Sequence, residues 1–484
     1  MAEIVGILNG FIWSKALIGL CLIAGLYFSF SMRFLQVRHF KHMIKLLVDG
    51  GDSDAGVSSF QALAISVSGR VGTGNIAGVA TAIGLGGPGA IFWMWMIAFL
   101  GAGSAYVESV LAQIYKEEQE GEYRGGPAYY IEKGLNMKWY SLTFAIATVF
   151  AVGLFLPGVQ SNSIASGLEN AFGLNPMYTG IGLTALLGLI VFGGVKRIGK
   201  VAEIVVPFMA IAYIIVAVII IGMNITKLPE VISLIFKSAF SLEPAFAGIL
   251  GMAISWGVKR GIYSNEAGQG TGPQAAAAAE VDHPAKQGLV QAFSVYIDTL
   301  FVCSATAFMI LISGTYNVEN GAGGYIVNNI NAKIGPAYTQ MAVESNLPGF
   351  GNYFVAISLL FFAFTTIMAY YYIAETNVAY IMKNKNGKLL INVLRIMILA
   401  ATFYGTIKTA ELAWGLGDLG VGVMAWLNII AIILLRKPAF IALKDYEEQK
   451  KLGVTNFEFN PSKLGIKGAE FWDRKNKKKK QIVD

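Results

Sequence analysis

One stretch of the chain reads Val67-Ser-Gly-Arg-Val-Gly-Thr-Gly-Asn-Ile-Ala-Gly78, inside an otherwise apolar run from Ser58 to Gly86. Glycine in a helix interior costs about 1 kcal/mol relative to alanine, so this cluster of glycines predicts a helix break. We expect Gly72, Thr73 and Gly74 to be non-helical. At membrane depth, such backbone is tolerated only in protein or beside water. A broken helix also directs free N–H groups toward an anion and free C=O groups toward a cation.

Composition indicates a polytopic helical membrane protein. The 484 residues are 55% hydrophobic and 14% charged, whereas soluble proteins are about 25% charged. Cys21 and Cys303 both lie in apolar stretches and indicate neither a disulfide framework nor a metal cluster. The three histidines lack metal-ligand spacing. With no nucleophile constellation either, we do not expect an enzyme.

Runs of about 20 apolar residues predict eleven membrane spans. They lie near residues 11–32, 58–86, 88–115, 140–168, 176–195, 200–223, 245–268, 286–312, 350–382, 389–408 and 411–435. Lys and Arg gather in alternate loops, so the positive-inside rule predicts an external N-terminus and a cytoplasmic C-terminus in the cell membrane. The first run carries its positive charge behind it, which favours a retained helix over a signal peptide. The basic tail is expected to face anionic lipid rather than nucleic acid.

The spans after the first divide into two groups of five. The predicted segments are 1–57 (an extra N-terminal helix and linker), 58–223 (first repeat), 224–435 (second repeat, with an outer loop at 314–349) and 436–484 (cytoplasmic tail). The second group also opens on an interrupted span, between Ser255 and Gly270. Five is odd, so the groups have opposite topology, and paired broken helices predict the binding site of a transporter. The alternative is that the glycines only allow close helix packing.

Two loops are expected to contain helices. The outer loop 314–349 is predicted to form short helices over an outer vestibule. The inner loop carries an alanine run at 275–279 that predicts a helix.

Three motifs resemble the alanine/glycine:cation symporter family. They are Gly86-Gly-Pro-Gly-Ala-Ile-Phe-Trp-Met-Trp-Met-Ile-Ala-Phe-Leu-Gly101, Gly69-Arg-Val-Gly-Thr-Gly-Asn-Ile-Ala-Gly78 and Ser264-Asn-Glu-Ala-Gly-Gln-Gly-Thr-Gly-Pro273. The first looks like the family signature along its full length, and the resemblance extends from about Ser58 to Leu435. It implies the leucine-transporter fold, an all-α fold with inverted five-helix repeats, and uptake of alanine or glycine driven by sodium or protons.

The resemblance also implies a binding site at the first break. Val71-Gly-Thr-Gly-Asn75 is similar to the Val-Gly-Leu-Gly-Asn run of bacterial amino-acid transporters with that fold. By position, the N–H groups of Gly72, Thr73 and Gly74 would hold the substrate carboxylate, and Asn75 would lie beneath it or bind a second cation. Arg70 stands where those transporters have an alanine near another sodium ion. A guanidinium there would repel the ion, so a second sodium site is not expected.

A co-transported sodium ion is expected between the second and ninth spans. The resemblance implies ligands from the carbonyls of Ser68 and Val71, from Phe362, and from the adjacent hydroxyls of Thr365 and Thr366, with Thr366 also near the substrate. Sodium is a hard cation that prefers such oxygen ligands. The alternative is that each threonine bonds the carbonyl four residues back, as is common in membrane helices.

Other residues are candidates for the pocket wall and the gates. At the second break, Ile254, Ser255, Trp256 and Gly257 are expected to limit side-chain size, and in the fourth span Phe155 and Gln160 flank Pro157 and face the pocket. Charged residues inside spans are functional candidates by default. These are Arg70, Glu108, Asp298, Glu375 and Asp418. Asp418 is a candidate outer gate, and Glu108 or Asp298 a partner for Arg70 or a proton carrier, while structural ion pairs are the alternative.

The sequence thus predicts a secondary transporter that couples uptake of a small neutral amino acid to sodium by alternating access. A proton-coupled symporter with the same fold and an ion channel remain the alternatives. The preference between alanine and glycine, the stoichiometry and the oligomeric state are left open.

Overall fold

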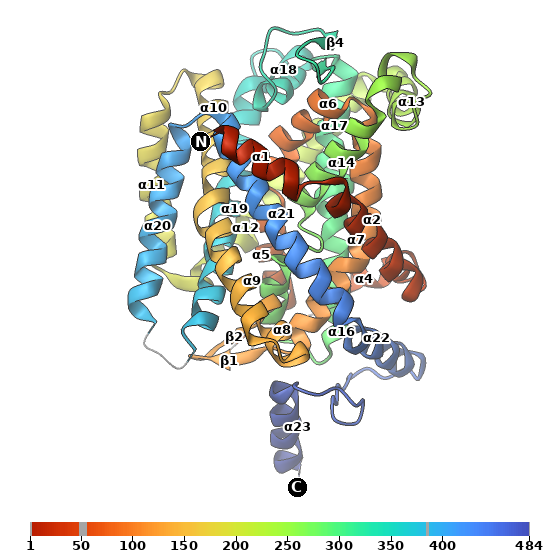
Figure 1. Ribbon diagram of the computed structural model, residues 1–484, viewed down its shortest axis with the longest axis vertical. Helices are drawn as coiled ribbons and strands as arrows, with labels where there is room; N and C mark the ends of the chain where they lie inside the picture. Colours follow the sequence, from red (N-terminus) through yellow and green to blue (C-terminus); the bar gives the residue numbers. More distant parts are fainter. Residues whose placement is uncertain (1, 48–55, 384–386, 484) are drawn as a thin grey trace.

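The computed structural model describes residues 2–47, 56–383 and 387–483, which form a helical bundle (Figure 1). The helices and strands, in chain order, are α1 (Ala2–Ile12), α2 (Lys15–Ser31), α3 (Leu35–Arg38), α4 (Phe40–Leu46), α5 (Ser59–Arg70), η1 (Gly74–Gly78), α6 (Val79–Gly86), α7 (Gly89–Ile114), β1 (Glu117–Gln119), β2 (Glu122–Arg124), α8 (Pro127–Leu135), α9 (Lys138–Phe150), η2 (Ala151–Phe155), α10 (Leu156–Phe172), α11 (Pro176–Val191), α12 (Gly194–Met223), η3 (Ile225–Lys227), α13 (Leu228–Ala239), η4 (Pro244–Ile249), α14 (Leu250–Asn265), α15 (Gly272–Ala278), α16 (Pro284–Tyr296), η5 (Ile297–Cys303), α17 (Ser304–Ser313), β3 (Asn317–Glu319), β4 (Tyr325–Asn328), α18 (Pro336–Asn346), α19 (Gly351–Ile381), α20 (Lys388–Thr406), α21 (Ala410–Leu434), α22 (Arg436–Lys451) and α23 (Glu470–Val483).

Seven helical segments among the described residues are long and apolar enough to cross a membrane. They are Gly89–Ile114, Lys138–Phe172, Arg197–Met223, Pro284–Ser313, Gly351–Ile381, Lys388–Thr406 and Ala410–Leu434. The α1–α2 pair, bent by 43°, becomes an eighth if it counts as one span. The expected first span, 11–32, therefore begins earlier than predicted and bends at Trp13 and Ser14.

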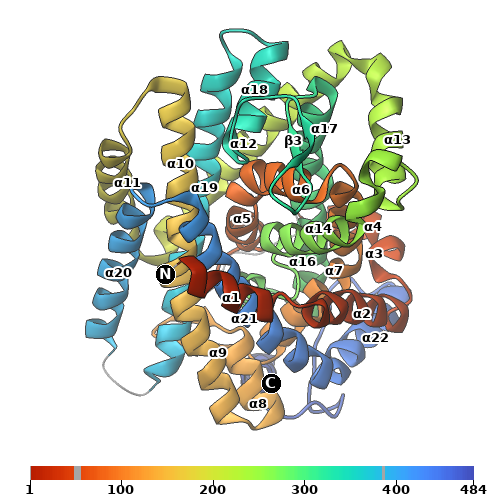
Figure 2. The ribbon, with the colours of Figure 1, turned by 45° about the horizontal axis from the view of Figure 1, so that its top comes forward.

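The helices pack in two groups. Helices α5, α6, α7, α14, α15 and α16 pack on one another, and α9, α10, α11, α19 and α20 form the second group. Helix α12 packs against α5 on one side and α19 on the other. Figures 1 and 2 show the two groups side by side, with α21 crossing in front of them.

The two ends of the bundle carry different structures, and we name each face after the structure that it carries. The loop-side face holds α13, α18 and the antiparallel pair β3–β4, and the tail-side face holds α8, the β1–β2 hairpin, α22 and α23 (Figure 1). The expectation of short helices in 314–349 is confirmed in part by α18, but Asn317–Glu319 and Tyr325–Asn328 pair as strands, which was not predicted. The predicted alanine-run helix is α15, which ends one residue early, at Ala278.

The two broken helices are joined at the tail-side face. Ser58 and Gln61 form a capping box that starts α5, with Ser58 Oγ accepting the Gln61 N–H at 3.1 Å. Just before it, Val57 N–H donates to Ala278 O, and Glu280 N–H donates to Val57 O, both at 2.9 Å. The chain entering the first broken helix is therefore paired with the chain leaving the second.

Candidate functional site

The first break is short and lies one residue before the predicted position. Helix α5 ends at Arg70, and Val71 (φ −78°, ψ 89°) and Gly72 are non-helical. Thr73 already has helical dihedrals, and Gly74 begins a π-helical turn. The expectation that Thr73 and Gly74 are non-helical was wrong, because the wider π turn keeps these small residues in helical backbone. All of these residues are buried.

Two N–H groups at the break have side-chain acceptors. Gly72 N–H donates to Asn75 Oδ1 at 2.8 Å, and Thr73 N–H donates to Gln160 Oε1 at 3.0 Å. Gln160 comes from α10, in the other helix group. At Gly74, an added Cβ would lie 3.1 Å from Ser264 Cα, so α14 packs directly on the break. Amide oxygens thus fill the acceptor positions where the sequence predicts a substrate carboxylate.

Several predicted cation ligands converge beside the break. Thr366 Oγ1 on α19 lies 2.8 Å from Ser68 O, 2.9 Å from Phe362 O and 3.4 Å from Val71 O. A single hydroxyl hydrogen can bond only one of these carbonyls at a time. Ser68 O lies in the last turn of α5, where carbonyls lack intrahelical partners and the helix dipole is negative. This group of oxygens suits a hard cation.

Thr365 does not join this group. Its Oγ1 bonds the carbonyls of Phe361 and Phe362, each at 3.0 Å, and faces Met209 Sδ of α12 at 3.9 Å. The prediction that both hydroxyls point at one ion was wrong for Thr365. Adjacent residues on a helix point about 100° apart, and only one of the two can face α5.

A polar cluster lies behind the break. Asn75 Nδ2 donates to Asp298 Oδ1 at 2.7 Å, Ser264 Oγ donates to the same oxygen at 3.0 Å, and Thr299 Oγ1 donates to Asp298 Oδ2 at 2.7 Å. Asp298 belongs to η5, a π-helical segment inside an apolar span. Ser264 was absent from the predicted site, although its position within the family motif Ser264–Pro273 could have revealed it. Asp298 thus connects the first break to the end of α14.

Arg70 has no carboxylate within 4 Å among the residues with described positions, so the expected ion pair with Glu108 or Asp298 was wrong. Its guanidinium donates to Gln291 O at 3.1 Å and to Ser294 Oγ. Glu108 instead accepts the Gly268 N–H at 3.2 Å and Asn428 Nδ2 at 2.7 Å. Three of these side chains, Arg70, Glu108 and Asp298, are at most 1% exposed.

The second break is longer and lies later than predicted. Helix α14 runs unbroken to Asn265, and residues 266–271 separate it from α15. Three residues of this segment have positive φ: Glu266 (56°), Gly268 (79°) and Gly270 (89°). The prediction that Ile254, Ser255, Trp256 and Gly257 line this break was wrong, because all four lie inside α14. An added Cβ at Gly257 would lie 2.6 Å from Trp93 Cβ, so that glycine serves packing on α7.

Gln160 and Phe155, the two residues predicted from the fourth span, lie in different places. Tyr263 and Tyr370 lie close to the Gln160 side chain, and Thr73 donates to it. Phe155 is half-buried and lies instead beside Gly420 of α21, where an added Cβ would be 3.5 Å from its ring. Glu375 forms an ion pair with Arg124 of β2 at 3.6 Å, which fits the structural alternative for an intramembrane charge.

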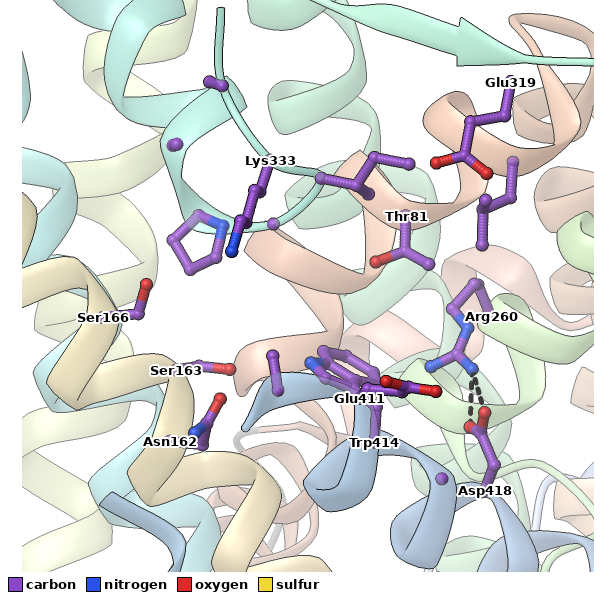
Figure 3. Close-up of a pocket in the computed structure, with 18 of the residues that line it drawn as sticks. Thr81, Asn162, Ser163, Ser166, Arg260, Glu319, Lys333, Glu411, Trp414 and Asp418 are labelled. Carbon is purple, nitrogen blue, oxygen red and sulfur yellow. Dashed lines mark hydrogen bonds and ion pairs between the residues drawn. The ribbon is translucent and has the colours of Figure 1, made fainter. Parts of the chain in front are cut away.

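A cavity of about 720 Å³ opens near the loop-side face, between α1, α6, α10, α14 and α21 (Figure 3). Asp418 lies at its floor, where both carboxylate oxygens accept from Arg260 at 2.5 Å and one pairs with Lys259 at 2.7 Å. The Arg260 guanidinium lies 4.7 Å from the Trp414 ring centre and 5.4 Å from that of Trp256. Below this layer, Trp414 and Arg260 both approach the Gly78 position of the first broken helix. The ion pairs and rings therefore line the cavity on the side where the first broken helix passes at Gly78.

Three curated relatives are similar to this chain over most of its length. A putative sodium/proton-dependent alanine carrier protein of Bacillus subtilis is 65% identical over 98% of both chains. The sodium/proton-dependent alanine carrier protein of Bacillus sp. strain PS3 is 55% identical over 89% of this chain and 97% of its own. A probable sodium/glutamine symporter of Bacillus subtilis is 47% identical over 98% of this chain and 96% of its own.

A solved structure and a family model complete the comparison. The manganese transporter of Eremococcus coleocola superposes with a TM-score of 0.53 at 13% identity, covering 84% of this chain and 89% of that one, which shows a shared leucine-transporter-like fold. A model of the sodium:alanine symporter family matches residues 1–460. The chain is therefore a multi-pass membrane transporter, not an enzyme, and belongs to the sodium:alanine symporter family.

Proposed function

We propose that this protein is a sodium-coupled symporter of alanine and glycine that works by alternating access. The observation that carries the proposal is the juxtaposition of cation and anion ligands at one break. Thr366 Oγ1 lies 2.8 Å from Ser68 O, and the Gly72 and Thr73 N–H groups follow within five residues of Ser68. The Bacillus relatives named as alanine carriers support the substrate, and their names also include the proton.

Sodium would bind first, between α5 and α19. The carbonyls of Ser68, Val71 and Phe362 and the Thr366 hydroxyl are its ligands. Its charge offsets the negative end of α5 and stabilises the break. The substrate carboxylate then takes over the Gly72 and Thr73 N–H groups. An N–H group forms a stronger hydrogen bond to an ionised carboxylate than to a neutral amide oxygen. The substrate carboxylate therefore competes well with the Asn75 and Gln160 oxygens.

The proposed topology has eleven spans. The bent α1–α2 pair, α11 and the two broken helices join the seven long apolar segments. Residues 58–223 and 224–435 form inverted five-helix repeats behind the extra N-terminal helix. The N-terminus lies outside and the tail-side face is cytoplasmic, as the distribution of Lys and Arg favours. The oligomeric state stays open.

The outer gate lies between the cavity and the first break. Asp418 of α21 joins Lys259 and Arg260 of α14, and Trp256 and Trp414 pack against the guanidinium. Opening this layer would admit the amino acid, which then reaches Gln160. Because both helices carry only part of the layer, a small tilt of α21 against α14 is enough to part it.

Radiolabelled alanine uptake into proteoliposomes tests the proposal. An inward sodium gradient should drive uptake, and potassium at equal pH should not. Thr366→Val removes the central oxygen while keeping the side-chain shape. Since a hydrogen bond to a charged group contributes about 1.5–3 kcal/mol, uptake at low sodium should fall about ten- to hundredfold. Thr365→Val is the matched control and should retain uptake.

Three outcomes would contradict parts of the proposal. Uptake that depends on a proton gradient, does not depend on sodium and is unchanged in Thr366→Val would show that the proton is the coupling ion. Glutamine uptake in place of alanine would replace the substrate. Sodium conductance without any amino acid would favour a channel.

A further inference from the structure

The C-terminal segment folds back under the bundle and buries large aromatic side chains. After α22, residues 452–469 lead into α23 beneath the tail-side face (Figure 1). Phe459 and Trp472 are each 1% exposed, and Phe471 is 6% exposed. A solvated basic tail would leave such residues in water, at a cost of about 1.5–3 kcal/mol for each large side chain. This segment is therefore part of the folded bundle.

Trp472 is the anchor of this segment. Its Nε1 donates to Gln113 O, in the last turn of α7, at 2.8 Å. Next to it, the fully buried Lys116 ammonium donates to Ala279 O at 2.8 Å. The same ammonium lies 4.2 Å from the Tyr123 ring centre, 4.8 Å from that of Phe471 and 5.8 Å from that of Trp472. The tail thus completes an aromatic cage around a cation that is bonded to the segment after α15.

Two ion pairs extend the contact in opposite directions. Lys475 Nζ lies 2.5 Å from Glu280 Oε1 and 3.1 Å from Val281 O, in the link between α15 and α16. Glu470 pairs with Lys133 of α8 at 2.8 Å. One turn of α23 therefore joins the chain that leaves the second broken helix to the helix that follows the β1–β2 hairpin.

The segments that α23 joins form a close seal. An added Cβ at Gly125 would lie 2.6 Å from Ala277 Cβ, and one at Gly126 would lie 3.0 Å from the Gln274 side chain. Beneath this contact, the side-chain amides of Gln274 and Gln287 are at most 1% exposed and have no hydrogen-bond partner among the described residues. Buried amides without partners are costly unless water reaches them in some state of the protein. Water would reach these amides in a state of the protein in which the seal opens.

We propose that the C-terminal segment 455–483 is a strap that holds this tail-side exit closed. The inference rests on alternating access in the proposed function. The exit opens when α15 separates from the hairpin and α8. The strap opposes this separation because Lys475 binds the link after α15 and Glu470 binds α8, while Trp472 anchors the strap on α7. Release of the strap shifts the population toward the state that is open on this face.

Cysteine labelling in lipid nanodiscs, where both faces are accessible, tests the strap. Gln274→Cys reports on the seal, since the native Cys21 and Cys303 are buried. Trp472→Ala in this background should raise the rate of labelling by a polar maleimide about fivefold or more. Arg474→Ala, an exposed neighbour on the same helix, should leave the rate unchanged. Cleavage by trypsin after Lys475 reports whether the strap has detached.

The readouts separate failure of the strap from failure of the transport proposal. If trypsin shows a detached strap and Gln274→Cys labels no faster, the strap does not hold the exit and the inference is wrong. If Trp472→Ala leaves the strap attached, a chain truncated after residue 454 is tested in its place. Unchanged labelling of Gln274→Cys in the truncated chain would also show that the inference is wrong. Neither result depends on which amino acid or ion is carried. Absence of alanine uptake with faster labelling would overturn the substrate and keep the strap.

Discussion

The two broken helices solve the same problem with different chemistry. At the first break only Val71 and Gly72 leave the helix, and two amide oxygens accept the backbone N–H groups, one from Asn75 three residues on and one from Gln160 of α10. The second break spans residues 266–271 and turns through three residues of positive φ. Its backbone is held by fixed partners, since Glu108 accepts the Gly268 N–H and Asn428 donates to Gly268 O.

This difference indicates that the two breaks have different roles, one in binding the substrate and one in fixing the bend of the chain. Neutral amide oxygens of Asn75 and Gln160 are exchangeable acceptors, so an arriving carboxylate can displace them without unfolding a helix. At the second break the partners form one network, because Glu108 also accepts from Asn428, which itself donates to Gly268 O. The first break is therefore suited to hold a substrate, and the second to keep α14 and α15 in a defined bend.

The largest effect is expected from Gly72→Ala. An added Cβ there would lie within van der Waals overlap of Thr366 Oγ1 and 3.0 Å from Gln160 Oε1. Overpacking of this kind costs about 1–3 kcal/mol, and at the site itself it should lower alanine uptake by up to about a hundredfold. Proteoliposome uptake at equal protein content measures it. Gly222→Ala, which has no neighbour within 4 Å, is the control. Equal uptake by both variants would remove Gly72 from the site.

At the second break, Gly270→Ala should affect stability before transport. Gly270 has φ 89°, and an added Cβ would lie 2.9 Å from the Phe144 ring and 3.0 Å from Asn428. A left-handed conformation alone costs a non-glycine residue about 1–2 kcal/mol. We expect a lower unfolding temperature in detergent, with the alanine KM of the remaining folded protein unchanged. Gly173→Ala shares a positive φ but has open space, so it isolates the steric part. A changed KM with normal stability would contradict the division between binding and bending.

A smaller effect tests whether Asp298 couples the two broken helices. Asn75 follows the first break and Ser264 precedes the second, and both donate to Asp298 Oδ1. The double-mutant cycle of Asn75→Ala and Ser264→Ala should show a coupling of about 0.5–1 kcal/mol in the free energy of unfolding, since residues of one network are not additive. Ser264→Ala combined with the distant Gly222→Ala should be additive. Additivity in the first pair would mean that the breaks are independent.

The existence of both breaks could be predicted from the glycine content of the two stretches. The proximity of Ser68, Val71 and Thr366 could be predicted from the family resemblance. The position of the second break could not. Lys259 and Arg260 lie within the stretch where an interruption was expected, but Asp418 pairs with both and aromatic rings cover them, and α14 continues through them. Gly268 and Gly270 were the better signal, because their backbone has a positive φ, which favours glycine.

Long-range contacts explain the other differences. The side that Thr365 faces depends on the rotation of α19 against α12, which helical periodicity alone does not fix. The basic residues near the C-terminus led to the expectation that the tail faces anionic lipid, and burial of Phe459, Phe471 and Trp472 in this segment was not expected. Their apolar character was visible in the sequence, but the surface that receives them exists only in the folded bundle.

The smallest expected effect concerns how the segments beside the breaks are capped. Ser58 caps α5 with a hydroxyl group that does not titrate, whereas His283 caps α16 with a neutral imidazole ring. The Nδ1 atom of His283 accepts the Ala285 N–H at 3.1 Å, and its Nε2 atom lies 3.0 Å from Asp445 Oδ2. Burial lowers the pKa of His283 despite the opposing charges of Asp445 and Asp282, with Lys286 adding to the decrease. The neutral ring therefore contributes its full stabilisation above the unfolded pKa of about 6.5.

As the pH falls from about 6.5 through the lower folded pKa of His283, that contribution is lost. A protonated Nδ1 cannot accept the Ala285 N–H, so the unfolding temperature should drop by an amount that corresponds to at most about 1 kcal/mol, the usual size of an N-cap. His283→Asn keeps a capping oxygen that does not titrate, and it should flatten this part of the pH profile. His42→Asn measures a separate contribution, because burial and the nearby Lys450 also lower the pKa of His42, to about 4, although its ring bonds Tyr446 at 2.7 Å and caps no helix. If His283→Asn and the native protein lose stability in parallel on acidification, the cap beside the second break is as insensitive to pH as the Ser58 cap beside the first.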